Sequence, residues 1–256
     1  MTGTGPFSDL LGVVQGGLKG MEIVDLSHLL EPLIPSWPPH AKYGHHLVES
    51  YTLGGVSCHY QLTMSEHTGT HFDAPLHFIG EGPYHYGIDQ VPLEAVIGRA
   101  LTISATSIEP CGLVSREFIT SWERQHGDIQ PGDVVLFHFG WDRRWGRRPE
   151  GASFLRDWPG LSREAAEYLV DKQARVVGTD ALSIDSYSST DFPSHYTLLG
   201  NGVLIGENFA NLGALPPSSL FMAFPLKIKG GSGSPIRAVA FVPRSEGHGP
   251  RGDDRP

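Results

Sequence analysis

The feature that most constrains this chain is the segment SEHTGTHFDAPLHF at residues 65–78, in which histidines and an aspartate are closely spaced. A continuous helix would place His67 and His71 on one face and Asp73 on the other. A continuous strand would place all three side chains on one face, but His67 and His71 would then lie about 13 Å apart. A bend resolves the conflict, because Gly69 is free to adopt a positive φ angle. The sequence therefore predicts a bent segment in which His67, His71 and Asp73 converge.

Converging imidazoles and a carboxylate are typical ligands of Zn²⁺ or Mn²⁺, and a carboxylate can also bridge two ions. His67, His71 and Asp73 are therefore candidate metal ligands, with Asp73 as the candidate bridge. His77 follows a rigid Ala-Pro step, and an imidazole that titrates near neutral pH is a common proton carrier. We predict that His77 acts as a general acid/base. The alternative for all four residues is an ordinary set of surface or hydrogen-bonded core side chains.

The later segment DFPSHYTLLGNGVLIGEN supplies two further candidate ligands, His195 and Glu207. If residues 196–199 and 203–206 pair as strands about a Gly-Asn-Gly turn, His195 and Glu207 lie directly across a hairpin. If Ser194 instead caps a one-turn helix, the strand that follows can still bring Glu207 back towards His195. A simple polar contact between the two side chains is the alternative to ligation.

Composition limits the classes of partner. A chain of 256 residues with 19 Lys and Arg against 28 Asp and Glu has a formal net charge of −9, which argues against nucleic acid and anionic membranes and favours a small-molecule substrate. The two separated cysteines, Cys58 and Cys111, and the lack of a signal-peptide pattern predict a cytoplasmic protein without disulfides. We expect a loosely ordered arm at residues 1–20, one domain at 21–243 and a disordered tail at 244–256.

Short β-rich runs alternate with turn signals and predict a mixed, β-rich α/β fold. Two segments are typical of helices, one that begins after a cap at Ser115 and ends at Gly127, and one that begins after Ser162. The second leads into an apolar strand, which suggests a β-α-β unit. The expected strands are SCHYQLTM, RALTIS, DVVLFHF, RVVGTDALSID, GVLIGEN and RAVAFVP.

The motifs resemble a known family. HTGTHFDAPLH is similar to the HxGTHxDxPxH signature of the metal-dependent cyclase/hydrolase family, which includes bacterial kynurenine formamidase, isatin hydrolase and trans-dienelactone hydrolase. IVDLSHLLEPLIPSWPPH, GDVVLFHFGW, VVGTDALSID and SHYTLLGNGVLIGEN extend the resemblance from about Ile23 to Val242. The resemblance implies a swivelling three-layer β/β/α domain and a homo-oligomer, either a dimer or a tetramer.

The resemblance also implies roles for individual residues. The matched metal ligands are His67, His71 and Asp73, completed by His195 and Glu207 around one or two ions per chain. His77 matches the catalytic base. Trp37 matches a substrate-contacting aromatic residue of the formamidases, with an ordinary buried tryptophan as the alternative. Two further matched positions, Asp180 and Asp185, are expected to support the site and neighbouring turns. The chain departs from the formamidases in its longer N-terminal arm and in extra residues at 140–160.

Together, the residues and the resemblance predict a hydrolase that cleaves a C–N amide or a cyclic ester or amide through a metal-activated water. N-formylkynurenine is one candidate substrate, and a lactone or lactam ring is the rival. The alternative of another class is a non-catalytic, metal-stabilised binding protein. A set of aromatic side chains is expected to form the wall of the substrate site: Trp37, Phe78, Trp141, Trp145 and Tyr187.

Overall fold

A computed structural model describes residues 16, 17 and 19–244, so most of the expected arm and all but the first residue of the expected tail lie outside the described residues. The helices are α2 (Arg116–His126), α3 (Arg163–Asp171) and α4 (Pro193–Leu199). The strands are β1 (Met21–Asp25), β2 (Gly44–Glu49), β3 (His59–Thr63), β4 (His71–Asp73), β5 (Ile97–Ser104), β6 (Leu113–Val114), β7 (Val134–His138), β8 (Gly160–Leu161), β9 (Val176–Thr179), β10 (Leu204–Glu207), β11 (Ser218–Pro225) and β12 (Gly233–Pro243).

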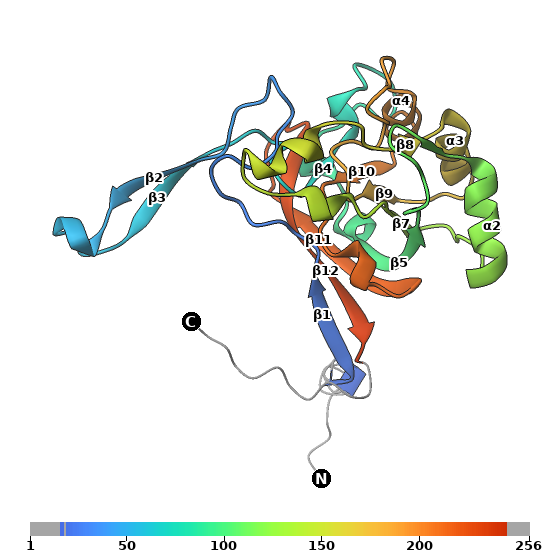
Figure 1. Cartoon of the computed structure of the whole chain (residues 1–256), viewed down its shortest axis with the longest axis horizontal. Coiled ribbons are helices and arrows are strands. Elements are labelled where there is room, and N and C mark those ends of the chain that lie inside the picture. The colour runs from blue at the N-terminus through green and yellow to red at the C-terminus, as the bar shows by residue number, and fades with distance from the viewer. Residues whose placement is uncertain (1–15, 18, 245–256) are drawn as a thin grey trace, which may run out of the picture.

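Eight strands form one sheet in the order β1-β12-β11-β5-β7-β9-β10-β4, and β4 also pairs with β12, so the sheet closes into a barrel-like structure (Figure 1). The closing strand β4 is short, and both of its edges are bonded. On one side His71 lies opposite Glu207 of β10, and on the other Asp73 lies opposite Gly233 of β12. The mixed, strand-rich α/β class is therefore confirmed.

Alternating side chains of the parallel strands fill two separate cores. Val134 and Leu136 of β7 point into the barrel, whereas Val135 and Phe137 point outwards to the helices. The outward core also receives apolar side chains from α2, α3 and α4. Two sheet layers and one helical layer result, as a β/β/α arrangement requires. Within the described residues, no helix is long and apolar enough to cross a membrane.

Both predicted helix starts are confirmed. The Ser115 hydroxyl accepts a hydrogen bond from the Phe118 amide, and the Ser162 hydroxyl accepts one from Ala165. The expected β-α-β unit is present, because β7 and β9 pair in parallel with α3 between them in the chain. The strand expected through RVVGTDALSID is too long, since β9 ends at Thr179. Local patterns do not predict the strands β2, β4, β6, β8 and β11.

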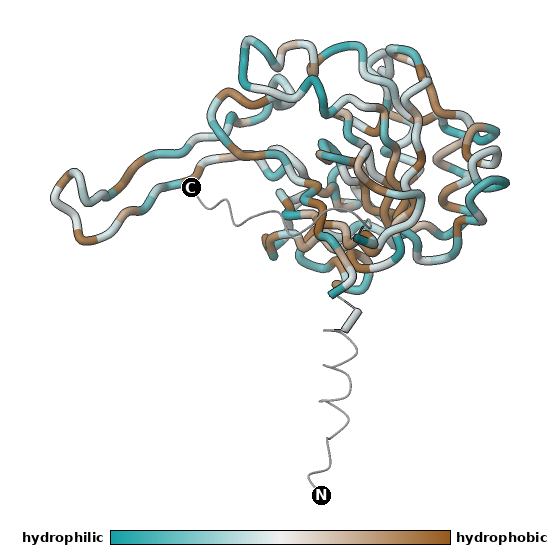
Figure 2. Tube along the Cα trace, turned by 60° about the horizontal axis from the view of Figure 1, so that its bottom comes forward, coloured by the Kyte–Doolittle hydropathy of each residue, from teal (hydrophilic) through white to brown (hydrophobic). Residues whose placement is uncertain are grey.

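The strands β2 and β3 form a separate two-stranded hairpin that extends away from the body (Figures 1 and 2). We call residues 44–63 the hairpin. Every residue of β3 is exposed, as are residues 45–48 of β2. Among the described residues, neither core includes any part of the hairpin. The hairpin is thus held to its own chain by its two connections and not by a packed face.

The extra residues at 140–160 form two 3₁₀ turns, Trp141–Arg144 and Glu150–Leu155. Their buried Trp141 and Phe154 join the helical core. Trp145 stacks on His28 with the ring centroids 4.1 Å apart. The insert therefore packs on the loop that follows β1.

Candidate metal centre

The central motif bends where the sequence predicts. Gly69 has a φ angle of +64°, and a Cβ atom at this position would lie 2.5 Å from the Cδ2 atom of Leu30. A side chain here would therefore be strained in its backbone and would collide with a neighbour. After the bend, His71 and Asp73 occupy alternate positions of β4 and share one face, while Phe72 points into the barrel core.

Two elements from later in the chain bring the other candidate ligands to this face. Glu207 of β10 lies directly across from His71 of β4. His195 lies in α4, so the hairpin expected between residues 196–199 and 203–206 is wrong and the helical alternative is observed. The helix begins at Pro193, whose ring fixes a helical φ angle, and not after a cap at Ser194.

The His71 ring is oriented by its second nitrogen. Its Nδ1 atom donates to the Gly69 carbonyl at 2.8 Å, and the Asn208 amide donates to the same carbonyl at 2.9 Å. The Nε2 atom of His71 then faces Asp73 Oδ1 at 3.4 Å and Glu207 Oε2 at 3.5 Å. A lone pair on Nε2 is thereby directed at two carboxylates.

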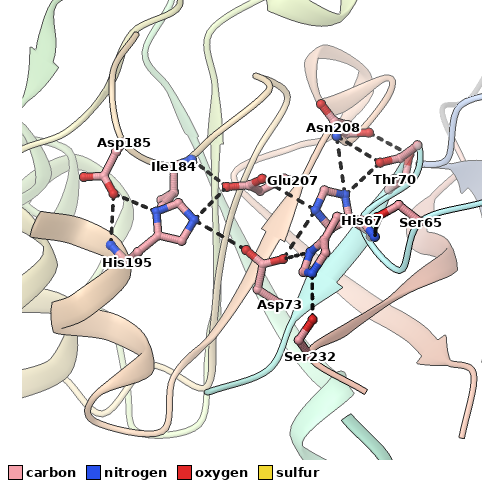
Figure 3. Close-up of polar contacts among 12 residues, drawn as sticks. Ser65, His67, Thr70, Asp73, Ile184, Asp185, His195, Glu207, Asn208 and Ser232 are labelled. Atoms are coloured by element: carbon pink, nitrogen blue, oxygen red, sulfur yellow. Dashed lines mark hydrogen bonds and ion pairs between the residues drawn. The ribbon is translucent and has the colours of Figure 1, made fainter. Parts of the chain in front are cut away.

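The His195 ring is oriented in the same way by Asp185. The Nδ1 atom of His195 donates to Asp185 Oδ2 at 2.7 Å, and that carboxylate also accepts from the backbone amides of Ser194 and His195. Its Nε2 atom faces Asp73 Oδ2 at 3.5 Å and Glu207 Oε1 at 3.4 Å (Figure 3). Each carboxylate thus offers a different oxygen to each imidazole.

This donor set fits a divalent cation. Ligand atoms about 2.1 Å from one tetrahedral ion are about 3.4 Å apart, close to the spacings of these nitrogen and oxygen atoms. Asp73 Oδ2 is buried and has no hydrogen-bond partner among the described residues. An imidazole lone pair that faces two carboxylates is unfavourable unless a positive charge lies between them. The geometry therefore provides a place for a cation.

The pKa shifts of His195 and Asp73 also indicate a place for positive charge. Burial opposes protonation of His195, but the hydrogen bond to Asp185 and the nearby carboxylates of Asp73 and Glu207 outweigh burial and hold its pKa well above the usual value. Burial likewise opposes ionisation of Asp73, but the neighbouring His67 and the imidazole bonds hold the pKa of this carboxyl well below its usual range. The cluster therefore favours positive charge, and protons and a metal ion would compete for the same nitrogen atoms.

His67 has both ring nitrogens engaged within the protein. Its Nδ1 atom lies 2.6 Å from Asp73 Oδ1, and its Nε2 atom lies 3.0 Å from the Ser232 hydroxyl (Figure 3). The Ser232 hydroxyl in turn donates to Glu66. Closely spaced ligand atoms define two overlapping groups: His67, Asp73 and His77, and His71, Asp73 and Glu207. All five predicted ligands and His77 are therefore brought together.

His77 lies beside the donor cluster at the edge of an open pocket. Its ring stacks on His67 with the centroids 4.0 Å apart, and it ends the 3₁₀ turn Pro75–His77. Burial lowers the pKa of His77 to about 4, so the ring is neutral at neutral pH. A neutral imidazole in this position can accept a proton from a nucleophile in the pocket.

Apolar and aromatic side chains also line the pocket. Trp37 makes edge contacts with Phe192 and Trp158, at centroid distances of 6.5 and 6.0 Å, and Phe78 and Leu182 extend the surface. Two of the five aromatic residues predicted for this wall are present, Trp37 and Phe78. The other three lie elsewhere in the molecule: Trp141 in the helical core, Trp145 on His28 and Tyr187 beside Trp158.

Sequence reasoning missed several residues that line the pocket: His40, Leu182, Ser183, Phe192 and Asn208. The signal that could have found them is their place in the motifs. His40 ends PSWPPH, Ser183 lies within VVGTDALSID, and Asn208 directly follows Glu207. Which side chains of these motifs face the pocket depends on tertiary contacts that a single sequence does not display.

A further histidine and aspartate group, His138, Asp142 and Asp180, lies outside this centre. The Asp180 carboxylate accepts from the backbone amides of Phe139 and Trp141, and Asp142 accepts from Asn211. Burial raises the pKa of Asp180 to about 7. Asp180 thus organises the turn after β7, in agreement with its expected support of neighbouring turns.

Comparison with known proteins identifies relatives along most of the chain. A family model described as putative cyclase matches residues 24–186. Isatin hydrolase from Roseibium aggregatum is 32% identical over 249 residues, which cover 88% of this chain and 93% of that protein. Kynurenine formamidase from Salinibacter ruber is 30% identical over 230 residues, which cover 86% of this chain and 97% of that protein.

Solved structures agree with these relatives. An isatin hydrolase bound to the product analogue thioisatinate superposes with a TM-score of 0.83 at 30% identity, covering 95% of this chain and 100% of that one. A protein described as a potential metal-dependent hydrolase with cyclase activity gives a TM-score of 0.69 at 27% identity, covering 88% of this chain and 99% of that one. The similarity therefore extends over nearly the whole fold.

Proposed function

Because the chain belongs to the putative cyclase family of metal-dependent hydrolases, we propose that His67, His71, Asp73, His195 and Glu207 hold its catalytic metal. The observation that supports this proposal is the convergence of two oriented Nε2 atoms on the same pair of carboxylates. The metal is Zn²⁺ or Mn²⁺, with one or two ions per chain, since imidazole and carboxylate ligands suit both. Asp73, whose two oxygens face different imidazoles, is the proposed bridge.

The reaction is hydrolysis of a C–N amide or a cyclic ester or amide in a small, ring-containing substrate. A divalent ion at the centre supplies Lewis-acid chemistry, because it lowers the pKa of water and polarises a carbonyl group. His77 accepts a proton from the nucleophilic water and returns it to the leaving nitrogen or oxygen. Trp37 packs against the substrate ring, and the apolar lining of the pocket excludes water.

Isatin and N-formylkynurenine are the two proposed substrate candidates, because the relatives compared above are named for reactions on these compounds. Both combine an aromatic ring with a carbonyl next to nitrogen, which suits an aromatic wall facing a cation site. A lactone ring, such as a dienelactone, is the third candidate. We further propose a single domain at residues 21–243, a cytoplasmic location consistent with the free Cys58 and Cys111, and a homo-oligomer, either a dimer or a tetramer.

The decisive experiment combines elemental analysis with turnover. Protein purified without chelator is expected to contain one to two equivalents of Zn²⁺ or Mn²⁺ and to hydrolyse at least one of these three compounds. Chelation should abolish turnover, and the same metal should restore it. Metal-free protein with undiminished turnover would refute the proposed centre.

The role of His77 is tested by His77→Ala, with His85→Ala as an exposed control from the same region. His77→Ala should lower kcat about 10²–10⁴-fold and leave the metal content unchanged, because His77 moves a proton in the proposed mechanism. The control should match the wild type. Wild-type kcat in His77→Ala would remove His77 from the mechanism.

A further inference from the structure

The segment GGSGSP at residues 230–235 brings a hydroxyl group to a candidate metal ligand. The Ser232 Oγ atom lies 3.0 Å from Nε2 of His67 (Figure 3). The Ala74 amide donates to the Ser232 carbonyl at 2.9 Å, and the next residue, Gly233, pairs with Asp73 in the register of β12 and β4. The same pairing that closes the barrel therefore holds Ser232 beside His67.

The glycines on either side of Ser232 allow this close approach. A Cβ atom at Gly233 would lie 2.6 Å from Cε1 and 3.0 Å from Nδ1 of His67. A Cβ atom at Gly231 would lie 2.8 Å from Oε1 of Glu66. Larger residues at these two positions would displace the side chains of Glu66 and His67, so the segment packs on both of them through a single short polar side chain.

The hydroxyl proton of Ser232 is directed at Glu66, the residue before His67. The Ser232 hydroxyl donates to Glu66 Oε2 at 2.8 Å, and the Ser232 backbone amide donates to the same oxygen at 2.9 Å. A hydroxyl has one proton, and a hydrogen bond to a carboxylate is stronger than one to a neutral acceptor. The Ser232 oxygen is therefore the acceptor in its contact with His67, and Nε2 of His67 carries the proton.

A neutral imidazole with its proton on Nε2 has its lone pair on Nδ1. In His67 this Nδ1 atom faces the donor cluster, 2.6 Å from Asp73 Oδ1. The rings of His71 and His195 have the opposite arrangement, because their Nδ1 atoms donate outside the cluster and their Nε2 atoms face the carboxylates. In all three rings, an acceptor outside the cluster takes the proton and leaves the inward nitrogen for a cation.

We propose that Glu66 and Ser232 are positioning residues that fix the tautomer of His67. His67 then binds the proposed metal through Nδ1, whereas His71 and His195 bind it through Nε2. This inference rests on the proposed function, because it requires a metal at the centre. Hydrogen-bond partners behind a ligating histidine fix its ring and increase its basicity. A residue directly before β12 thereby orients the first candidate ligand of the motif at residues 65–78.

Heteronuclear NMR of the intact, zinc-loaded protein tests the tautomers directly, because zinc is diamagnetic. Correlations between the ring nitrogens and the carbon-bound ring protons distinguish a proton on Nδ1 from one on Nε2. The proton should lie on Nε2 in His67 and on Nδ1 in His71 and His195. A proton on Nδ1 of His67 with zinc bound overturns the proposal, because that ring would then orient Asp73 without binding the ion. A chain that binds no zinc would instead refute the proposed centre, and this inference with it.

Zinc affinity, measured by competition with a chelator, tests the role of the hydroxyl. Ser232→Ala removes the acceptor for the Nε2 proton of His67 and should weaken zinc binding about 10- to 100-fold. Ser153→Ala, at an exposed position in the insert, is the matched control and should bind zinc as the wild type does. Wild-type affinity in Ser232→Ala overturns the positioning role.

A double variant tests whether Glu66 acts through Ser232. Glu66→Gln keeps the shape of the side chain but removes the charged acceptor, so zinc affinity should fall, whereas Glu94→Gln at an exposed position should have no effect. Glu66→Gln combined with Ser232→Ala should bind zinc no more weakly than Ser232→Ala alone, because the two residues belong to one chain of hydrogen bonds. Losses that add in the double variant overturn this chain.

Discussion

Two strands that are close neighbours in the chain have opposite surroundings. Strand β3 ends at Thr63 and is exposed along its whole length, whereas β4 begins at His71 and is buried in every residue. The first has one partner strand, and the second is bonded on both edges. The difference shows that the candidate metal ligands lie on the strand that is buried and paired on both edges. The exposed hairpin instead contributes to neither core of the described residues.

The largest effect is expected from Asp73→Ala, in the buried strand β4. Removal of this carboxylate takes one partner from both oriented imidazoles, so metal content and kcat/KM should fall together, with kcat/KM lower by about 10³-fold or more. Asp171→Ala, at the exposed end of α3, is the control and should change neither quantity. Retained metal and turnover in Asp73→Ala would show that β4 does not carry the centre.

A smaller effect is expected from Asp185→Asn. Asp185 fixes the Nδ1 atom of His195, and loss of such an orienting carboxylate typically weakens metal binding about 10- to 100-fold. Competition with a chelator measures this affinity. Asp191→Asn, at a highly exposed position nearby, should bind metal as the wild type does. Equal affinities in both variants would mean that the His195 side of the centre does not depend on its orienting bond.

The two halves of the centre differ in how far the sequence determines them. The bend at Gly69 follows from local rules, because three candidate ligands within a seven-residue segment can meet only if the chain turns between them. The position of His195 does not, because a Gly-Asn-Gly sequence is also a hairpin signal and only the packing of α4 decides between the two forms. Residues such as His40 and Ser183 come from loops, for which no periodicity exists.

The pH dependence of stability tests the buried surroundings of β4. His28 belongs to these surroundings, because its backbone amide donates to Thr70 just before β4. Burial lowers the pKa of His28 from 6.5 to about 4, so the unfolded chain binds more protons between these pH values. The free energy of unfolding should therefore be highest above pH 6.5 and fall as the pH drops towards 4, by on the order of 1–3 kcal/mol from this residue.

His28→Phe keeps a flat ring against Trp145 and removes the titration, so it should flatten this part of the profile measured by urea unfolding. His85→Gln, at an exposed position, should leave the profile unchanged. A profile as steep in His28→Phe as in the wild type would mean that another group causes the acid sensitivity.

The smallest effect is expected on the substrate side, from Trp37→Leu. Loss of an aromatic contact of about 0.5–1.5 kcal/mol should raise KM about two- to tenfold without loss of metal. Tyr187→Leu is the matched control, because Tyr187 also contacts Trp158 but does not line the pocket. An equal rise of KM in both variants would contradict the proposed contact between Trp37 and the substrate.

The double pairing of β4 has a consequence for the newly made chain. The motif at residues 65–78 leaves the ribosome early, but its strand has no partner until residues 204–207 and 233–235 have been made. The early histidines therefore cannot form the complete centre during most of synthesis, and His195 and Glu207 join them only near the end. Binding of the proposed metal would thereby be coupled to completion of the chain, because a polypeptide that stops before β12 lacks the strand that closes the barrel beside the candidate ligands.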